Sequence, residues 1–62
     1  MQATFYNQLC NLEVTITRNS DGQVIIETYS LNKDRTLEKY ESYNSFQDEV
    51  EYHINEGWEQ TD

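Results

Sequence analysis

His53 is the residue whose type and neighbours come closest to a reactive or metal-binding group. Glu49 lies four residues before it and Glu56 three residues after it, so in a helix both carboxylates lie one turn from the imidazole. A histidine between two carboxylates can bind zinc or transfer protons. The sequence has no second histidine, and a further ligand would have to come from elsewhere. We therefore predict that His53 is a packed residue hydrogen-bonded to a neighbouring carboxylate, with no metal and no cofactor.

Two other groups could in principle do chemistry. Cys10 is the only cysteine, and it has no basic neighbour in the sequence to activate its thiol, so we expect a small core or edge residue. Asp21 and Gly22 match the middle of a calcium-binding loop, but that alignment places Thr17 and Thr28 where carboxylates are needed. We predict no catalytic residue and a protein that is not an enzyme.

The length and charge of the chain limit its fold and its partners. With 62 residues and a net charge of −8, we expect a single domain over residues 1–62. Its core is small, so a bound partner or a homodimer would add stability. The acidic excess excludes direct binding to nucleic acid or an anionic membrane and favours a basic partner. The lone cysteine, the N-terminus without a signal pattern and the lack of a long apolar segment predict a cytoplasmic protein.

Alternating apolar residues predict a β-hairpin in the first half of the chain. Residues 12–16 alternate between apolar and polar side chains, and residues 23–29 are rich in β-branched and aromatic types. A three-residue loop over 20–22, with Gly22 left-handed, sets the register between the two strands. In that register Leu12, Val14 and Ile16 share a face with Ser30, Thr28, Ile26 and Val24. A loop one residue shorter or longer would bury Glu27, which is costly for an unpaired carboxylate.

Further strands are expected on both sides of the hairpin. Residues 4–9 are predicted to form a strand, followed by a turn at residues 10–11. A second turn is expected at residues 32–34. Residues 35–43 form either a fourth strand or a short helix, because their apolar and aromatic positions fit neither period. We favour the strand.

The last third of the sequence predicts a helix. Ser45 and Asp48 have the spacing of an N-terminal capping motif, and apolar residues recur every four positions from Phe46 through Val50, Ile54 and Trp58. With Gly57 as the stop, we predict a helix over about 46–56. The predicted fold is α+β, a small antiparallel sheet of three to four strands in a meander. One C-terminal helix packs on one face of this sheet, with no strand after it.

The acidic charge is concentrated in the C-terminal third of the chain, after residue 40. Residues 1–40 carry five acidic and four basic side chains, whereas residues 41–62 carry seven acidic side chains and no Lys or Arg. In the predicted helix the acids occupy the face opposite the apolar stripe, with Tyr52 in their midst. We predict that a partner binds this acidic surface, formed by Glu41, Asp48, Glu49, Glu51, Tyr52, Glu56 and Glu59.

Two interpretations of this acidic surface are open. A solvated helix face is normally charged, and acidity keeps a small protein soluble. However, Glu56 and Glu59 lie near the negative end of the helix dipole, and no lysine offsets the repulsion between neighbouring acids. Carboxylates about 5 to 6 Å apart can occupy phosphate positions in a groove lined by Arg or Lys. Tyr52 would suit an anchor at such an interface.

The sequence resembles the small acidic inhibitors made by bacteriophages and mobile elements, several of which mimic DNA. Residues 19–22, the strand over 23–30 and the segment Gly57-Trp58-Glu59-Gln60 resemble anti-CRISPR proteins that occupy the DNA-binding groove of a Cas nuclease. Tyr43 followed by Asp48-Glu49-Val50 resembles the phage inhibitors of uracil-DNA glycosylase. The predicted lack of a strand after the helix departs from those glycosylase inhibitors. The resemblance implies a protein acting in the bacterial host cytosol.

Two functions follow as expectations. The first is a non-enzymatic inhibitor or regulator that binds the basic, nucleic-acid-binding groove of a partner enzyme, as a DNA mimic of the anti-CRISPR or glycosylase-inhibitor type. The second is a cytosolic interaction or assembly protein whose helix charge only favours solvation. It would bind through the sheet edge or through exposed aromatic residues such as Tyr29, Tyr40 and Tyr43.

Overall fold

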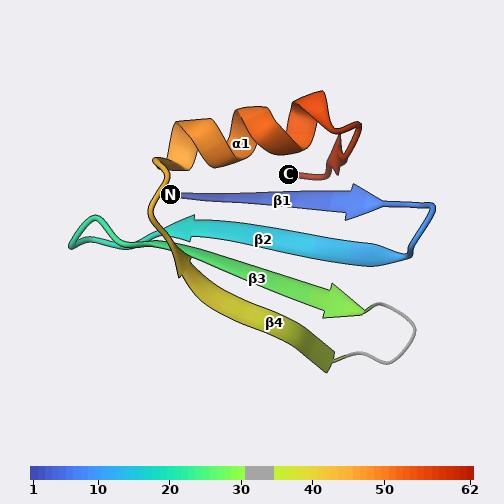
Figure 1. The fold of residues 1–62 in the computed structure, drawn as a ribbon, viewed down its shortest axis with the longest axis horizontal. Coiled ribbons are helices and arrows are strands. Elements are labelled where there is room, and N and C mark those ends of the chain that lie inside the picture. Colours follow the sequence, from blue (N-terminus) through green and yellow to red (C-terminus); the bar gives the residue numbers. More distant parts are fainter. Residues whose placement is uncertain (31–34) are drawn as a thin grey trace.

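A helix lies against one antiparallel sheet in the computed structural model, which describes residues 1–30 and 35–62. The elements are β1 (Gln2–Asn7), β2 (Leu12–Arg18), β3 (Val24–Ser30), β4 (Arg35–Ser42), α1 (Phe46–Asn55) and β5 (Glu59–Gln60). The five strands are arranged in the order β4-β3-β2-β1-β5 (Figure 1). The predicted α+β architecture is confirmed. No helix within the described ranges has the length and apolar character needed to cross a membrane.

The register of the central hairpin agrees with the prediction. Val14 pairs with Thr28 and Ile16 with Ile26, so these residues lie on one face of the sheet. Gly22 has a φ of 90°, which is the left-handed conformation expected of the loop. Asn19 stabilises this loop, because its side-chain oxygen accepts a hydrogen bond of 3.0 Å from the Gln23 amide.

The fourth strand explains why residues 35–43 fit neither period. Strand β4 pairs with β3, but the register shifts between Thr28, which faces Glu38, and Tyr29, which faces Thr36. Leu37 is therefore an extra residue in β4, and such a bulge interrupts the alternation of side chains. Beyond it, Tyr40 pairs with Ile26 and lies on the helix side of the sheet. The predicted strand is confirmed, with its end at Ser42.

Three predicted boundaries need correction or fall outside the description. The first strand begins at Gln2 and ends at Asn7, because the Asn7 side chain accepts hydrogen bonds from two turn amides and so stops the strand. A strand does follow the helix, since β5 pairs with β1 and the sheet has five strands. Its short length hid it from a pattern search. The turn expected at residues 32–34 lies outside the described residues.

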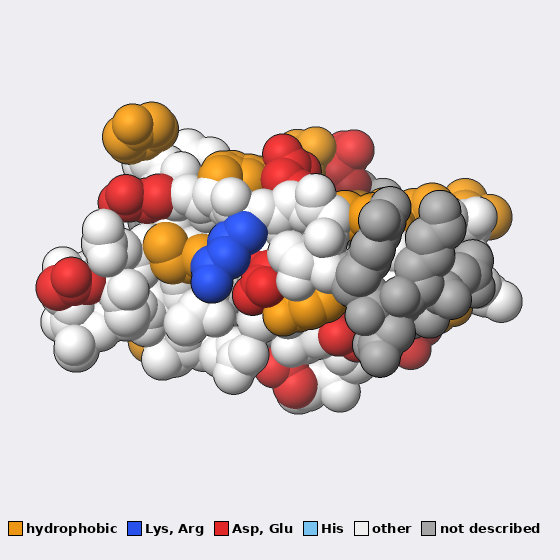
Figure 2. Space-filling view, turned by 90° about the horizontal axis from the view of Figure 1, so that it is seen from below, with side chains coloured by type: hydrophobic (Ala, Val, Ile, Leu, Met, Phe, Trp, Pro, Cys, Tyr) orange, Lys and Arg blue, Asp and Glu red, His pale blue; other side chains and the backbone are white. Residues whose placement is uncertain are grey.

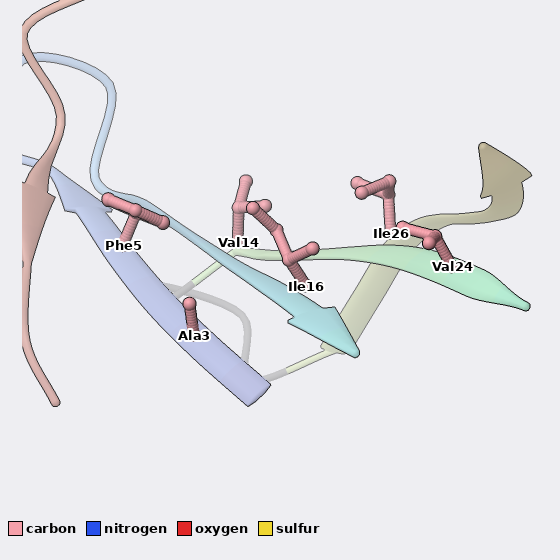
Figure 3. Packing of buried hydrophobic residues seen from close by; sticks show 6 residues of the cluster. All are labelled: Ala3, Phe5, Val14, Ile16, Val24 and Ile26. Carbon is pink, nitrogen blue, oxygen red and sulfur yellow. The ribbon is translucent and has the colours of Figure 1, made fainter. Parts of the chain in front are cut away.

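The core consists of six buried side chains from the first three strands. All six point to the same side of the sheet (Figure 3), where α1 adds Phe46 and Val50, and Trp58 follows the helix. Phe5 and Ile16 are fully buried at its centre. The other four are Ala3, Val14, Val24 and Ile26.

Helix α1 begins as predicted but presents a different face to the sheet. The Ser45 hydroxyl accepts a hydrogen bond of 3.1 Å from the Asp48 amide, which confirms the cap. Ile54, expected in the apolar stripe, is 51% exposed, whereas His53 is buried. A spacing of four residues drifts around a helix with 3.6 residues per turn, so the buried set is i, i+3, i+4 and i+7 from Phe46.

The turn at the C-terminal end of α1 determines the position of Trp58. Gly57 has a φ of 88°, and the amides of Gly57 and Trp58 bond to the carbonyls of Ile54 and His53. This double hydrogen-bond pattern ends the helix at Asn55 and turns the chain back. Trp58 therefore reaches the core from beyond the helix and leads into β5. The predicted stop at Gly57 is confirmed.

Candidate functional site

The outer surface of α1 carries four of the seven residues predicted to bind a partner. These four side chains are exposed, and all of them lie on or at the end of the helix: Asp48, Glu51, Tyr52 and Glu56. We call this set the α1 outer surface. Gln47 donates a hydrogen bond of 3.3 Å to Glu51 on the same side of the helix. Tyr52 is 57% exposed, so its ring is available for contact with a partner.

Glu49 does not belong to that surface, and its predicted outward placement is wrong. It is only 7% exposed and lies between α1 and the end of β4. Its Oε1 atom accepts hydrogen bonds from the Ser42 hydroxyl at 2.8 Å and from the Asn44 side-chain amide at 3.0 Å. These two neutral donors, together with the positive end of the helix dipole, offset part of the cost of burying a carboxylate.

The two remaining predicted residues lie on the other side of the sheet. Glu41 pairs with Ile25, and Glu59 pairs with Tyr6. Ile25 and Tyr6 are each next to a core residue in their strands, so their side chains point to the opposite face from the core. Glu41 and Glu59, which pair with them, therefore lie on the face that α1 does not cover. They also lie in β4 and β5, at opposite edges of the sheet. The fold therefore brings four of the seven residues together and separates the other three from them.

His53 has a structural role at the centre of the helix-to-sheet interface. Its Nδ1 atom lies 2.7 Å from the carbonyl oxygen of Glu49, so this nitrogen donates the hydrogen bond. Its ring stacks on Phe5 and meets the rings of Tyr52 and Trp58 edge to face, with centroids 5.3–5.4 Å apart. The hydrogen-bond acceptor differs from the prediction, because it is a backbone carbonyl and not a carboxylate.

No cluster of three or more His, Cys, Asp or Glu side chains that could hold a metal ion forms within residues 1–30 and 35–62. Cys10 is exposed in the turn after β1, so of the two expected positions, core or edge, the core position is wrong. In that turn the backbone amides of Leu9 and Cys10 donate hydrogen bonds to the Asn7 side-chain oxygen.

A depression lies between α1 and β4, and sequence patterns alone did not reveal it. Its volume is about 280 Å³, and its lining residues are Tyr40, Asn44, Glu49, Tyr52 and His53. We call it the tyrosine pocket. Tyr40 on β4 is 46% exposed and Tyr52 lies on α1, so two tyrosines from different elements line the same pocket as the buried Glu49. Tyr40 reaches this position because the bulge at Leu37 sets which side chains of β4 face the helix.

The electrostatics of the tyrosine pocket are negative. Burial, together with the negative charges of Glu49 and Glu38, raises the pKa of Tyr40 above its usual value of 10.0. On the other face of the sheet, hydrogen bonding to the Glu27 carboxylate raises the pKa of Tyr29. Carboxylates therefore act on one tyrosine on each face of the sheet.

A larger depression of about 480 Å³ lies between the hairpin loop, the end of β4 and the start of α1. Its lining includes both Arg18 and Glu41, which are of opposite charge, so it has no clear preference for an anion or a cation. On the side of the molecule nearest β4, acidic side chains of the described residues lie at several places, and basic side chains of the described residues are seen at one place (Figure 2).

These features define a small acidic α+β protein whose notable surfaces are a carboxylate-bearing helix and a tyrosine-lined pocket. Protein-family models, curated proteins and solved structures contain no match to this chain.

Proposed function

We propose that the chain is a non-enzymatic binding protein that inhibits or regulates a nucleic-acid-binding protein in the cytoplasm. The α1 outer surface docks on the basic groove of that partner. The observation that carries this proposal is the exposure of three carboxylates and one tyrosine on a single helix, in a segment without Lys or Arg. Carboxylates on successive turns can bind Arg and Lys side chains that otherwise hold phosphates.

The helix carries an energetic cost that supports this proposal over simple solvation. Asp48 lies in the first turn of α1, where the helix dipole stabilises a negative charge. Glu56 caps the C-terminal end, where the dipole destabilises a negative charge. Solvation alone would be served equally well by Lys at that position, which would also strengthen the helix. A local cost without structural gain is typical of a functional surface.

The proposal is tested with two variants that change the net charge equally. The first, Asp48→Asn with Glu51→Gln and Glu56→Gln, neutralises the α1 outer surface. The control, Asp21→Asn with Glu41→Gln and Glu59→Gln, neutralises three exposed acids elsewhere. Each immobilised variant is used to capture proteins from a bacterial lysate, and bound proteins are eluted with duplex DNA.

We expect the parent and the control to retain a nucleic-acid-binding protein that duplex DNA displaces, and the first variant to lose it. Equal retention by both variants would overturn the proposal, as would a captured protein that DNA does not displace. Purified Cas nucleases and uracil-DNA glycosylase, assayed for inhibition by the parent chain, distinguish the anti-CRISPR type from the glycosylase-inhibitor type.

A second candidate function rests on the free edge of β4. This strand ends the sheet, and Leu37 and the fully exposed Tyr43 lie on it or just after it. An exposed edge strand can pair with a strand of another protein. If this edge is the interface, Leu37→Ser with Tyr43→Ser will abolish capture while neutralisation of the α1 outer surface leaves it intact.

A further inference from the structure

The hydrogen bonds of Glu49 leave one of its oxygens available to a ligand. Both donors, from Ser42 and Asn44, bond to Oε1. Among the described residues, no fully buried side-chain nitrogen or oxygen lacks a hydrogen-bond partner. The Oε2 atom of Glu49 receives no hydrogen bond from a described residue. Since every fully buried polar side-chain atom in this part of the chain is bonded, Oε2 must be in contact with solvent, although Glu49 as a whole is only 7% exposed. The tyrosine pocket is the depression that Glu49 lines.

Two other residues that line the pocket also carry acceptor atoms. Asn44 uses its amide nitrogen to bond Glu49, so its Oδ1 remains an acceptor. His53 donates through Nδ1 to a backbone carbonyl, and in that tautomer of the imidazole Nε2 is an acceptor. Three of the residues that line the pocket therefore carry acceptor atoms, and one of the three is the buried carboxylate of Glu49.

The two tyrosines complete the complementarity to a cation. Tyr40 on β4 and Tyr52 on α1 line the same pocket as the Glu49 carboxylate, and an aromatic ring can bind a cation over its face. Burial and the charges of Glu49 and Glu38 raise the pKa of Tyr40, so the carboxylate that lines the pocket acts on one of its tyrosines. At about 280 Å³, the pocket is smaller than the roughly 300–1,000 Å³ typical of small-molecule sites and suits one side chain.

We infer that the tyrosine pocket binds an arginine side chain of the partner protein. A guanidinium has five N–H donors and no acceptor, is always charged, and stacks on aromatic rings, which matches a pocket of acceptors between two phenols. The ammonium of lysine is a compact, strongly hydrated charge that makes less use of the aromatic faces. This inference rests on the proposed function, because the arginine belongs to the basic surface that faces the α1 outer surface.

The pocket is tested without any partner, by NMR titration of the chain with Nα-acetyl-arginine amide. The citrulline analogue, which has the same shape and no charge, and the lysine analogue serve as comparison probes. We expect saturable shifts at Tyr40, Tyr52 and the Asn44 side-chain amide, with a dissociation constant on the order of millimolar. Citrulline should bind at least about tenfold more weakly, as one lost charge-assisted contact implies.

Glu49→Gln is the decisive variant, because glutamine keeps an acceptor for Ser42 and Asn44 while removing the charge. It should weaken binding of the arginine probe at least about tenfold. Glu51→Gln makes the same change of charge outside the pocket and should leave binding within about twofold of the parent, because only screened, long-range attraction is lost. Tyr52→Leu, which keeps an apolar side chain of the helix, should weaken it without unfolding the chain.

The arginine assignment is overturned if citrulline or lysine binds as well as arginine, or if Glu49→Gln and Glu51→Gln weaken binding equally. A folded spectrum for Glu49→Gln with unchanged affinity would also overturn it. The outcome is separable from that of the proposed function. Arginine binding without capture of a DNA-displaceable partner would keep the pocket and reject the docking proposal, and capture without arginine binding would do the reverse.

Discussion

Two isoleucines show how strongly position, and not residue type, determines the contribution of a side chain here. Ile16 is fully buried beneath the helix, whereas Ile54 is half-exposed on α1. Ile16→Val should lower the free energy of unfolding by about 0.5–1.5 kcal/mol, because it removes a methylene from a packed core. Ile54→Val should change it by less than about 0.5 kcal/mol. Urea unfolding of both variants measures the difference, and equal losses would contradict the helix orientation described above.

Tyr40 offers a second residue-scale prediction, on ionisation. Its pKa is raised by burial first and by the charge of Glu49 second, so Glu49→Gln should lower that pKa toward 10.0, and Glu51→Gln should not. The folded chain holds the phenol proton more tightly than the unfolded chain does. Its contribution to stability is therefore complete below about pH 10 and is lost as the pH rises through the folded-state pKa. NMR titration of the Tyr40 ring measures the shift, and an unchanged pKa in Glu49→Gln would contradict the pocket geometry.

At the scale of elements, the sequence contains enough local information for the central hairpin but not for the helix orientation. The register of β2 and β3 follows from the left-handed Gly22 and from the cost of burying Glu27, both of which are local. To predict which face of α1 packs on the sheet, one would have to know whether Ile54 or His53 is buried. His53 is buried because Phe5, Tyr52 and Trp58 contact its ring, and the contact with Phe5 joins two distant parts of the chain.

The tyrosine pocket could not be predicted from the sequence either, because it also depends on contacts between different elements. Tyr40 and Glu49 could both be seen as candidates for contact, but on separate surfaces. They meet because a bulge at Leu37 and a hydrogen bond from Ser42 to Glu49 join the end of β4 to α1. Neither feature has a sequence signature. The exposed acids of the α1 outer surface, in contrast, could be predicted from helical spacing, although the same spacing wrongly placed Glu49 among them.

The ends of α1 provide the element-scale prediction. Glu56→Lys replaces an acid at the C-terminal end of the helix and should raise the free energy of unfolding by about 0.3–1 kcal/mol. Asp48→Lys places the same new charge at the N-terminal end and should lower it by a similar amount. Both should weaken binding to a basic partner. Thermal or urea unfolding gives the two signs, and changes of the same sign would show that the dipole does not control these positions.

At the scale of the whole molecule, the charge is distributed over surfaces of different kinds. One glutamate is buried beneath α1, others lie on the uncovered face of the sheet, and the α1 outer surface presents its carboxylates to solvent. A net charge of −8 therefore does not act as a uniform field. If docking uses the α1 outer surface, only part of this charge contributes strongly to binding, and the dependence of affinity on salt reports which part.

The most direct test measures the affinity of the captured partner for the chain between about 50 and 500 mM salt, a range over which screening of surface charges changes strongly. The parent is compared with Asp48→Asn/Glu51→Gln/Glu56→Gln and with the equally charged control Asp21→Asn/Glu41→Gln/Glu59→Gln. We predict a steep loss of affinity with salt for the parent and the control, and a weaker, flatter dependence for the first variant. Equal affinities and equal slopes for the two variants would contradict docking through α1.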